Sequence, residues 1–140
     1  MKQTIISVMF LSVSLVILFF MSCEFDPPKG SRPYQVMQGK AIFAEQCAPC
    51  HGMKDKAATV DTLKTPAPDL TLIMKRRGVT KFPIAEIARF IDGRQEVAAH
   101  GPREMPVWGE VYKAKGMTEG EIRGRKGQLV AYLMEIQNLD

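Results

Sequence analysis

The chain has 140 residues, a formal net charge of +4, and 46% apolar and 24% charged residues. This composition is that of an ordinary globular protein with room for one modest domain. Basic residues sit close to acidic ones and form no continuous stripe, so nucleic acid is not an expected partner. The cysteine count of three is odd, which excludes a closed set of disulfides unless one thiol has another fate.

Residues 1–22 carry the pattern of an export signal. Lys2 precedes a run of 17 uncharged residues, 5–21, which is short for a stable anchor because a spanning helix needs about 20 apolar residues. The segment ends in a serine followed by Cys23, which resembles a bacterial lipoprotein signal whose cysteine becomes the lipidated first residue. We expect lipidation of Cys23, with an uncleaved helical anchor or an unmodified thiol as alternatives. Each alternative places the folded domain outside the cytoplasmic membrane.

Residues 23–33 contain three prolines and are expected to form an extended tether to a folded domain, 34–140. The domain begins with a predicted helix over 34–46. Its apolar residues recur at approximately helical spacing. They are Val36, Met37, Ala41, Ile42 and Ala44.

Two cysteines and a histidine follow this helix in the order Cys47-Ala-Pro-Cys50-His51. A thioredoxin-type dithiol requires a strand before its first cysteine, and none is predicted here. A zinc site requires four ligands, and only Cys23 and His100 remain as further cysteine or histidine ligands. The order Cys-x-x-Cys-His is typical of covalent haem attachment, so we expect one haem c at this point.

The spacing of the motif has a chemical reason. Thioethers from Cys47 and Cys50 would tether the two vinyl groups of haem, and His51 would then present an imidazole nitrogen to the iron. A porphyrin would also give a small domain with long loops a large apolar group to pack around.

The middle of the domain alternates loops with short helices. Residues 56–68 lack any sustained period and contain two prolines, so they are expected to form a loop. A short helix is predicted over 69–77, with Asp69 as its cap and Gly78 as its stop. A second helix, 82–93, has an expected apolar face and a glycine at its end. This face comprises Ile84, Ile87, Ala88 and Ile91.

A loop rich in glycine and proline, 100–109, contains the candidate for the second axial iron ligand. Met105 lies between prolines in this loop, and a methionine ligand gives an electron-transfer centre with a raised potential. His100 and Met117 are the rival ligands. An empty sixth position would instead produce a ligand-binding or peroxidase-like centre.

The last predicted helix, 118–137, begins with a capping box formed by Thr118 and Glu121. Leu129, Leu133 and Ile136 form its apolar stripe. No segment shows the two-residue alternation of a half-buried strand. The predicted fold class is therefore all-α, with about four helices and long loops.

These motifs resemble those of the class I c-type cytochromes, over nearly all of residues 34–140. The segments CAPCHG and MPVWG match the haem-binding motif and the sixth-ligand loop of that family. The resemblance implies a cytochrome c fold around one covalent haem. It also implies a crossing of the terminal helices at Gly39, Phe43 and Tyr132.

The resemblance implies further haem contacts. The carbonyl of Pro68 would accept a hydrogen bond from the outer nitrogen of His51, and Leu70 would pack on the porphyrin. Arg94 and Trp108 would line the propionate edge, with a surface arginine and an ordinary core tryptophan as the alternatives.

The leading functional hypothesis is a membrane-tethered, non-enzymatic electron carrier of a respiratory chain, with His51 and Met105 as axial ligands of a six-coordinate iron. The family resemblance implies a quinol-oxidising complex or a cytochrome as donor and a terminal oxidase or reductase as acceptor. A permanent subunit of a larger redox complex is the alternative, and a haem enzyme or gas-binding protein is a third hypothesis.

Overall fold

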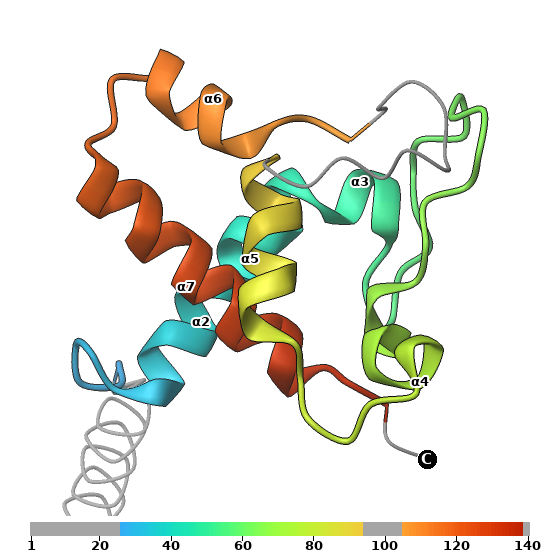
Figure 1. Cartoon of the computed structure of the whole chain (residues 1–140), viewed down its shortest axis with the longest axis horizontal. Helices are drawn as coiled ribbons and strands as arrows, with labels where there is room; N and C mark the ends of the chain where they lie inside the picture. Colours follow the sequence, from blue (N-terminus) through green and yellow to red (C-terminus); the bar gives the residue numbers. More distant parts are fainter. Residues whose placement is uncertain (1–25, 94–104, 139–140) are drawn as a thin grey trace, which may run out of the picture.

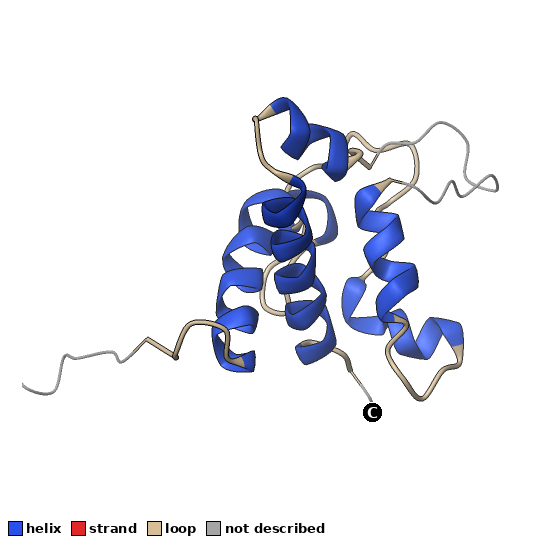
Figure 2. Cartoon of the chain, turned by 60° about the vertical axis from the view of Figure 1, so that its left-hand side comes forward, coloured by secondary structure: helices blue, strands red, loops and turns tan. Residues whose placement is uncertain are grey.

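The computed structural model describes residues 26–93 and 105–138. Within these ranges the chain forms six α-helices and one 3-10 helix and contains no strand (Figures 1 and 2). In chain order they are α2 (Arg32–Gln46), α3 (Ala48–His51), η1 (Leu70–Leu72), α4 (Ile73–Arg77), α5 (Ile84–Asp92), α6 (Trp108–Ala114) and α7 (Glu119–Glu135). The predicted all-α class is confirmed.

Side-chain caps determine where several of these helices begin. Asp69 accepts a hydrogen bond from the Thr71 amide at the start of η1, as the sequence predicts. Thr118 and Glu121 form the predicted capping box of α7, in which each side chain bonds the backbone amide of the other residue. Ser31 caps α2, which therefore starts at Arg32, two residues before the predicted domain start at 34.

The two longest helices of the described residues, α2 and α7, cross at a glycine. A Cβ atom on Gly39 would overlap the backbone carbonyl of Gln128, so only glycine permits this approach. Beside the crossing, the rings of Phe43 and Tyr132 lie 5.2 Å apart at a tilt of 55°. The crossing that the family resemblance implies is therefore present in the structure.

Helices α4 and α5 complete the core around this pair (Figure 1). The buried cluster draws its apolar side chains from α2, α4, α5 and α7. Its members are Ile42, Phe43, Ile73, Ile87, Ile91, Leu129, Val130, Tyr132 and Leu133. Cys47, Leu70 and Trp108 pack against its edge, so the candidate site residues rest on the same core.

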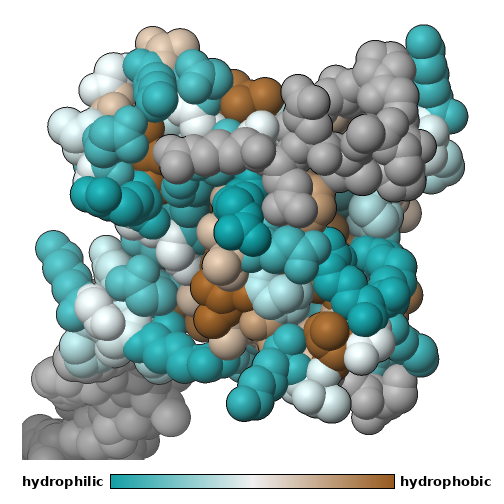
Figure 3. All heavy atoms as spheres, viewed as in Figure 1, coloured by the Kyte–Doolittle hydropathy of each residue, from teal (hydrophilic) through white to brown (hydrophobic). Residues whose placement is uncertain are grey.

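Ile84 does not belong to the buried face predicted for residues 82–93. Its side chain is 52% exposed, because Ile84 is the first residue of α5 and the following turns, with Ile87 and Ile91, make the core contact. Figure 3 shows a small apolar area over α5 on a face that is otherwise largely polar.

Two helices were not expected from the sequence. Helix α3 has only four residues, which is too short to show a period. Helix α6 starts at Trp108 inside the predicted loop 100–109, just after the proline that follows Met105. No helix in the described ranges has the length and apolar character needed to cross a membrane.

Candidate haem-binding site

Helix α3 and its N-cap residue Cys47 together hold both cysteines and the histidine. Cys47 ends α2 by donating its amide to the carbonyl of Phe43, 2.9 Å away. The carbonyl of Cys47 then accepts hydrogen bonds from the amides of Cys50 and His51, at 3.1 and 2.9 Å. Pro49 fits the first turn of α3, where a free amide is not needed. The three reactive side chains are therefore fixed relative to α2 by backbone hydrogen bonds.

The two thiols of this motif are free and half-buried. Burial, with a smaller contribution from the neighbouring Cys50, raises the pKa of Cys47 to about 12. A redox dithiol requires the opposite shift, because the thiolate is the nucleophile in disulfide exchange. The environment of Cys47 therefore does not favour the thioredoxin-type alternative.

The ring of His51 is oriented by a backbone carbonyl. Its Nδ1 lies 2.8 Å from the carbonyl oxygen of Pro68, and since a carbonyl only accepts, Nδ1 must carry the proton. Burial lowers the pKa of His51, although the bond to Pro68 opposes this shift, and the Arg76 charge lowers the pKa further. The lowered pKa favours the neutral imidazole, in which the Nε2 lone pair is available to a metal.

The remaining predicted contacts lie on nearby elements. Leu70 begins η1, two residues after Pro68. Met105 is half-buried in the bend that precedes α6. Trp108 begins α6, with its ring 6.1 Å from that of Tyr112. In Figure 1 the segment leading into α6 runs toward the side of the molecule on which α3 lies.

Three candidate residues lie outside the described ranges. Cys23, the predicted lipidation site, Arg94, the predicted propionate contact, and His100, the rival axial ligand, all belong to segments of which no structure is described. Within residues 26–93 and 105–138, no group of three or more His, Cys, Asp or Glu side chains is arranged to hold a metal ion.

A buried contact that the sequence did not predict lies beside the cysteines. The hydroxyl of Tyr112 donates to Oε1 of Gln46, 2.5 Å away, and only 1% of Tyr112 is exposed. The guanidinium of Arg125 lies 5.5 Å above the Tyr112 ring. The spacing of Trp108 and Tyr112, four residues apart, was the available signal for a helix with an aromatic face.

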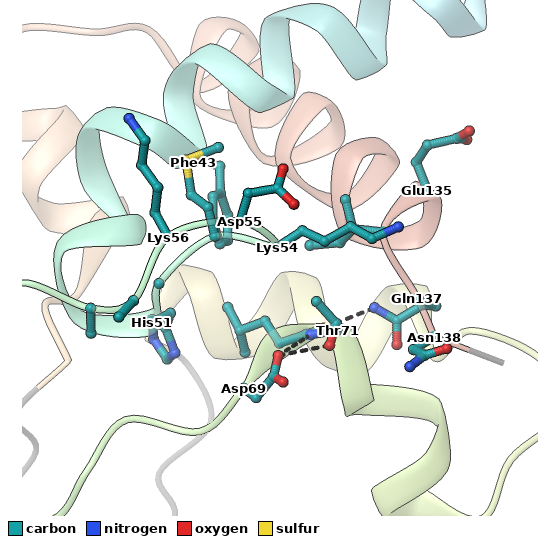
Figure 4. A pocket seen from close by; sticks show the side chains of 16 residues that line it. Phe43, His51, Lys54, Asp55, Lys56, Asp69, Thr71, Glu135, Gln137 and Asn138 are labelled. Atoms are coloured by element: carbon teal, nitrogen blue, oxygen red, sulfur yellow. Dashed lines mark hydrogen bonds between the residues drawn. The ribbon is translucent and has the colours of Figure 1, made fainter. Parts of the chain in front are cut away.

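A cavity of about 1010 Å³ lies beside His51. Figure 4 shows His51 at one end and Gln137 and Asn138 at the other, with Asp69 and Thr71 along one wall. Among the described residues, those that line the cavity do not include Cys47, Cys50 or Met105. The cavity therefore borders the haem-attachment motif at His51.

The sequence of the chain also matches a known protein family. The family model described as cytochrome c oxidase, cbb3-type, subunit III matches residues 35–120, more than half of the chain. The chain belongs to this family of c-type cytochromes. No curated protein and no solved structure matches it significantly.

A c-type cytochrome binds haem c covalently, and the residues of this chain fit that cofactor. Both thiols are unpaired and lie within one helical turn of the histidine. His51 donates a hydrogen bond from Nδ1 to the Pro68 carbonyl, which leaves Nε2 for the iron. Histidines that bind metals commonly donate their other ring N–H in this way. Cys47, Cys50 and His51 of this cytochrome are therefore suited to hold haem c.

Proposed function

We propose that the protein carries single electrons in a respiratory chain, using one haem c ligated by His51 and Met105. The observation that supports this most directly is the 2.8 Å hydrogen bond from His51 Nδ1 to Pro68, in a chain with both haem-attachment cysteines free. Such a contact fixes the tautomer and the ring orientation of a histidine that binds a metal.

Haem c, when bound, supplies a one-electron Fe(III)/Fe(II) couple. The Pro68 carbonyl orients the proximal imidazole. Met105 lies in the bend before α6, where the proline that follows limits backbone movement. The thioether of Met105, as sixth ligand, would raise the potential and leave no position for a substrate. This ligand set favours electron transfer over catalysis.

The ligand assignment is tested by the visible spectrum of the oxidised full-length protein. We expect a methionine-to-iron charge-transfer band that disappears in Met105→Ala and persists in Met117→Leu and His100→Ala. A high-spin spectrum in the unmodified protein would overturn the proposal. Loss of the band in one of the two rivals alone would reassign the ligand.

The second candidate function is a fixed subunit of a larger membrane redox complex. The description of the matching family, a cbb3-type oxidase subunit, favours this alternative. Purification from membranes in mild detergent separates the two. A mobile carrier should elute alone, whereas a subunit should elute together with other haem or copper proteins.

The proposed place of action is the outer face of the cytoplasmic membrane, with a lipid on Cys23 as the anchor. The support comes from the sequence of residues 1–23, with its uncharged run ending in serine and cysteine. The proposed donor is a quinol-oxidising complex or a cytochrome, and the proposed acceptor is an oxidase or reductase. The intact mass of the mature protein tests the anchor, since haem, acyl chains and cleavage before Cys23 each change that mass.

A further inference from the structure

The end of α7 is hydrogen-bonded to the segment that holds the His51 ring. The Gln137 side chain donates from Nε2 to the Leu70 carbonyl at 2.9 Å, and its Oε1 accepts from the Met74 amide at 3.1 Å. The Asn138 amide donates to the Thr71 carbonyl at 2.8 Å. We call Gln137 and Asn138 the C-terminal clasp. Figure 4 shows the clasp at the end of the cavity opposite His51.

The clasp acts on the segment that carries the Pro68 carbonyl. Between Pro68 and Thr71, the side chain of Asp69 accepts from both the amide and the hydroxyl of Thr71 at 2.8 Å, which makes a local turn. The Pro68 carbonyl, on one side of this turn, accepts from His51. The Leu70 and Thr71 carbonyls, on the other side, accept from the clasp. A continuous series of contacts thus joins α7 to the candidate iron ligand.

Helix capping accounts for only one of the hydrogen bonds that the Gln137 side chain makes. Its Nε2 also donates to the Leu133 carbonyl at 2.7 Å, which satisfies one terminal carbonyl of α7. Its other two hydrogen bonds leave the helix and reach residues 67 and 63 positions away in the chain. The family match ends at residue 120, so the clasp lies beyond the part of the chain that it covers.

We propose that Gln137 is a positioning residue that holds the Pro68 carbonyl against His51 and thereby adjusts the reduction potential of the haem. This inference rests on the proposed function only in requiring His51 on the iron. A hydrogen bond from Nδ1 makes the imidazole a stronger electron donor, which favours Fe(III). Loosening the 68–71 segment weakens that bond, so the potential rises.

The test compares Gln137→Met, which preserves length and removes every hydrogen bond of the amide, with two controls in α7. Thr118→Ala weakens the opposite end of the same helix, and Glu135→Gln changes an exposed neighbour whose ion-pair partner is Arg32. The measurements on the haem-loaded full-length protein are the hydrogen-exchange rate of His51 Nδ1–H and the reduced-to-oxidised ratio at a fixed ambient potential.

For Gln137→Met we expect the His51 Nδ1–H to exchange at least about tenfold faster and the reduced-to-oxidised ratio of the haem to be about threefold higher. Residues that hydrogen-bond to metal ligands commonly have effects of this order. Both controls should match the parent. Parent values in Gln137→Met, or an equal shift in Thr118→Ala, would overturn the proposal. If Gln137→Met does not fold, Gln137→Glu keeps the acceptor for Met74 and is judged by the exchange rate alone.

This experiment separates its own failure from failure of the proposed function. A spectrum without methionine ligation would overturn the carrier with Met105 but leave the His51 Nδ1–H measurement valid. An unchanged exchange rate of His51 Nδ1–H in Gln137→Met would show that the clasp does not position His51, and it would leave the proposed axial ligands unaffected.

Discussion

Asp92 and Lys126 form a buried ion pair at the point where three helices meet. Lys126 Nζ lies 2.8 Å from Asp92 Oδ1, with the two side chains 14% and 8% exposed. Asp92 ends α5 and Lys126 belongs to α7. On α6, a Cβ atom at Gly109 would lie 2.6 Å from the same carboxylate oxygen. The helix that follows Met105 therefore packs closely against this pair at Gly109.

Replacing Lys126 by methionine should destabilise the protein by about 3 kcal/mol, because it removes the ammonium group that lies 2.8 Å from a buried carboxylate. The measurement is the midpoint of guanidinium denaturation of the haem-loaded protein. The double variant Asp92→Asn with Lys126→Met should recover part of the loss, since no buried charge then remains. A Lys126→Met protein as stable as the parent would show that the pair is not desolvated in solution.

The residues of the haem motif could be predicted because their relationship is local. Cys47, Cys50 and His51 lie within five consecutive residues, and their order favours haem attachment once the missing strand argues against a dithiol and the missing ligands argue against zinc. The bond from His51 to Pro68 spans 17 positions and came only from the family resemblance. The clasp contact of Gln137 with Leu70 spans 67 positions, and no sequence pattern marks it because glutamine occurs on most helix surfaces.

At the scale of the elements, the α2–α7 crossing determines how close the haem motif comes to the C-terminal helix. Gly39 occupies the contact, where the nearest atoms of α7 are the backbone carbonyl of Gln128 and Cβ of Tyr132. Backbone atoms cannot move aside as a flexible side chain can. The helices must separate if a side chain is introduced there.

Gly39→Ala should therefore destabilise the protein by about 3 kcal/mol. Gly127→Ala, in the middle of α7, is the matched control, because its Cβ meets nothing within 4 Å. Alanine is the better helix former, so the control should gain up to about 1 kcal/mol. Denaturation midpoints of the two variants should move in opposite directions, and a parallel movement would contradict the account.

Helix N-termini with a capping side chain could be predicted from the sequence, whereas the short helices could not. Asp69 and Thr118 carry their capping signals in adjacent residues. Helix α6 has seven residues and follows a segment rich in proline and glycine, so local sequence favours a loop. Its stability comes instead from tertiary contacts, including the burial of Tyr112 and its bond to Gln46. Such contacts are visible only in the folded molecule.

At the scale of the whole molecule, one helix pair supports both sides of the candidate site. Helix α2 continues into the haem-attachment turn, and α7 reaches the Pro68 segment through the clasp. Helix α6, which follows Met105, packs against α5 and α7. A frame of this kind suits the proposed electron carrier, because it holds the His51 side and the Met105 side of the site on the same packed helices.

The proposed six-coordinate iron is tested by exposing the reduced full-length protein to carbon monoxide and by a redox titration. An iron with both axial positions filled by His51 and Met105 has no free site for the gas. We predict an unchanged visible spectrum under carbon monoxide and a titration with a single one-electron step. A carbon monoxide adduct in the parent protein, or a second redox step, would contradict the account.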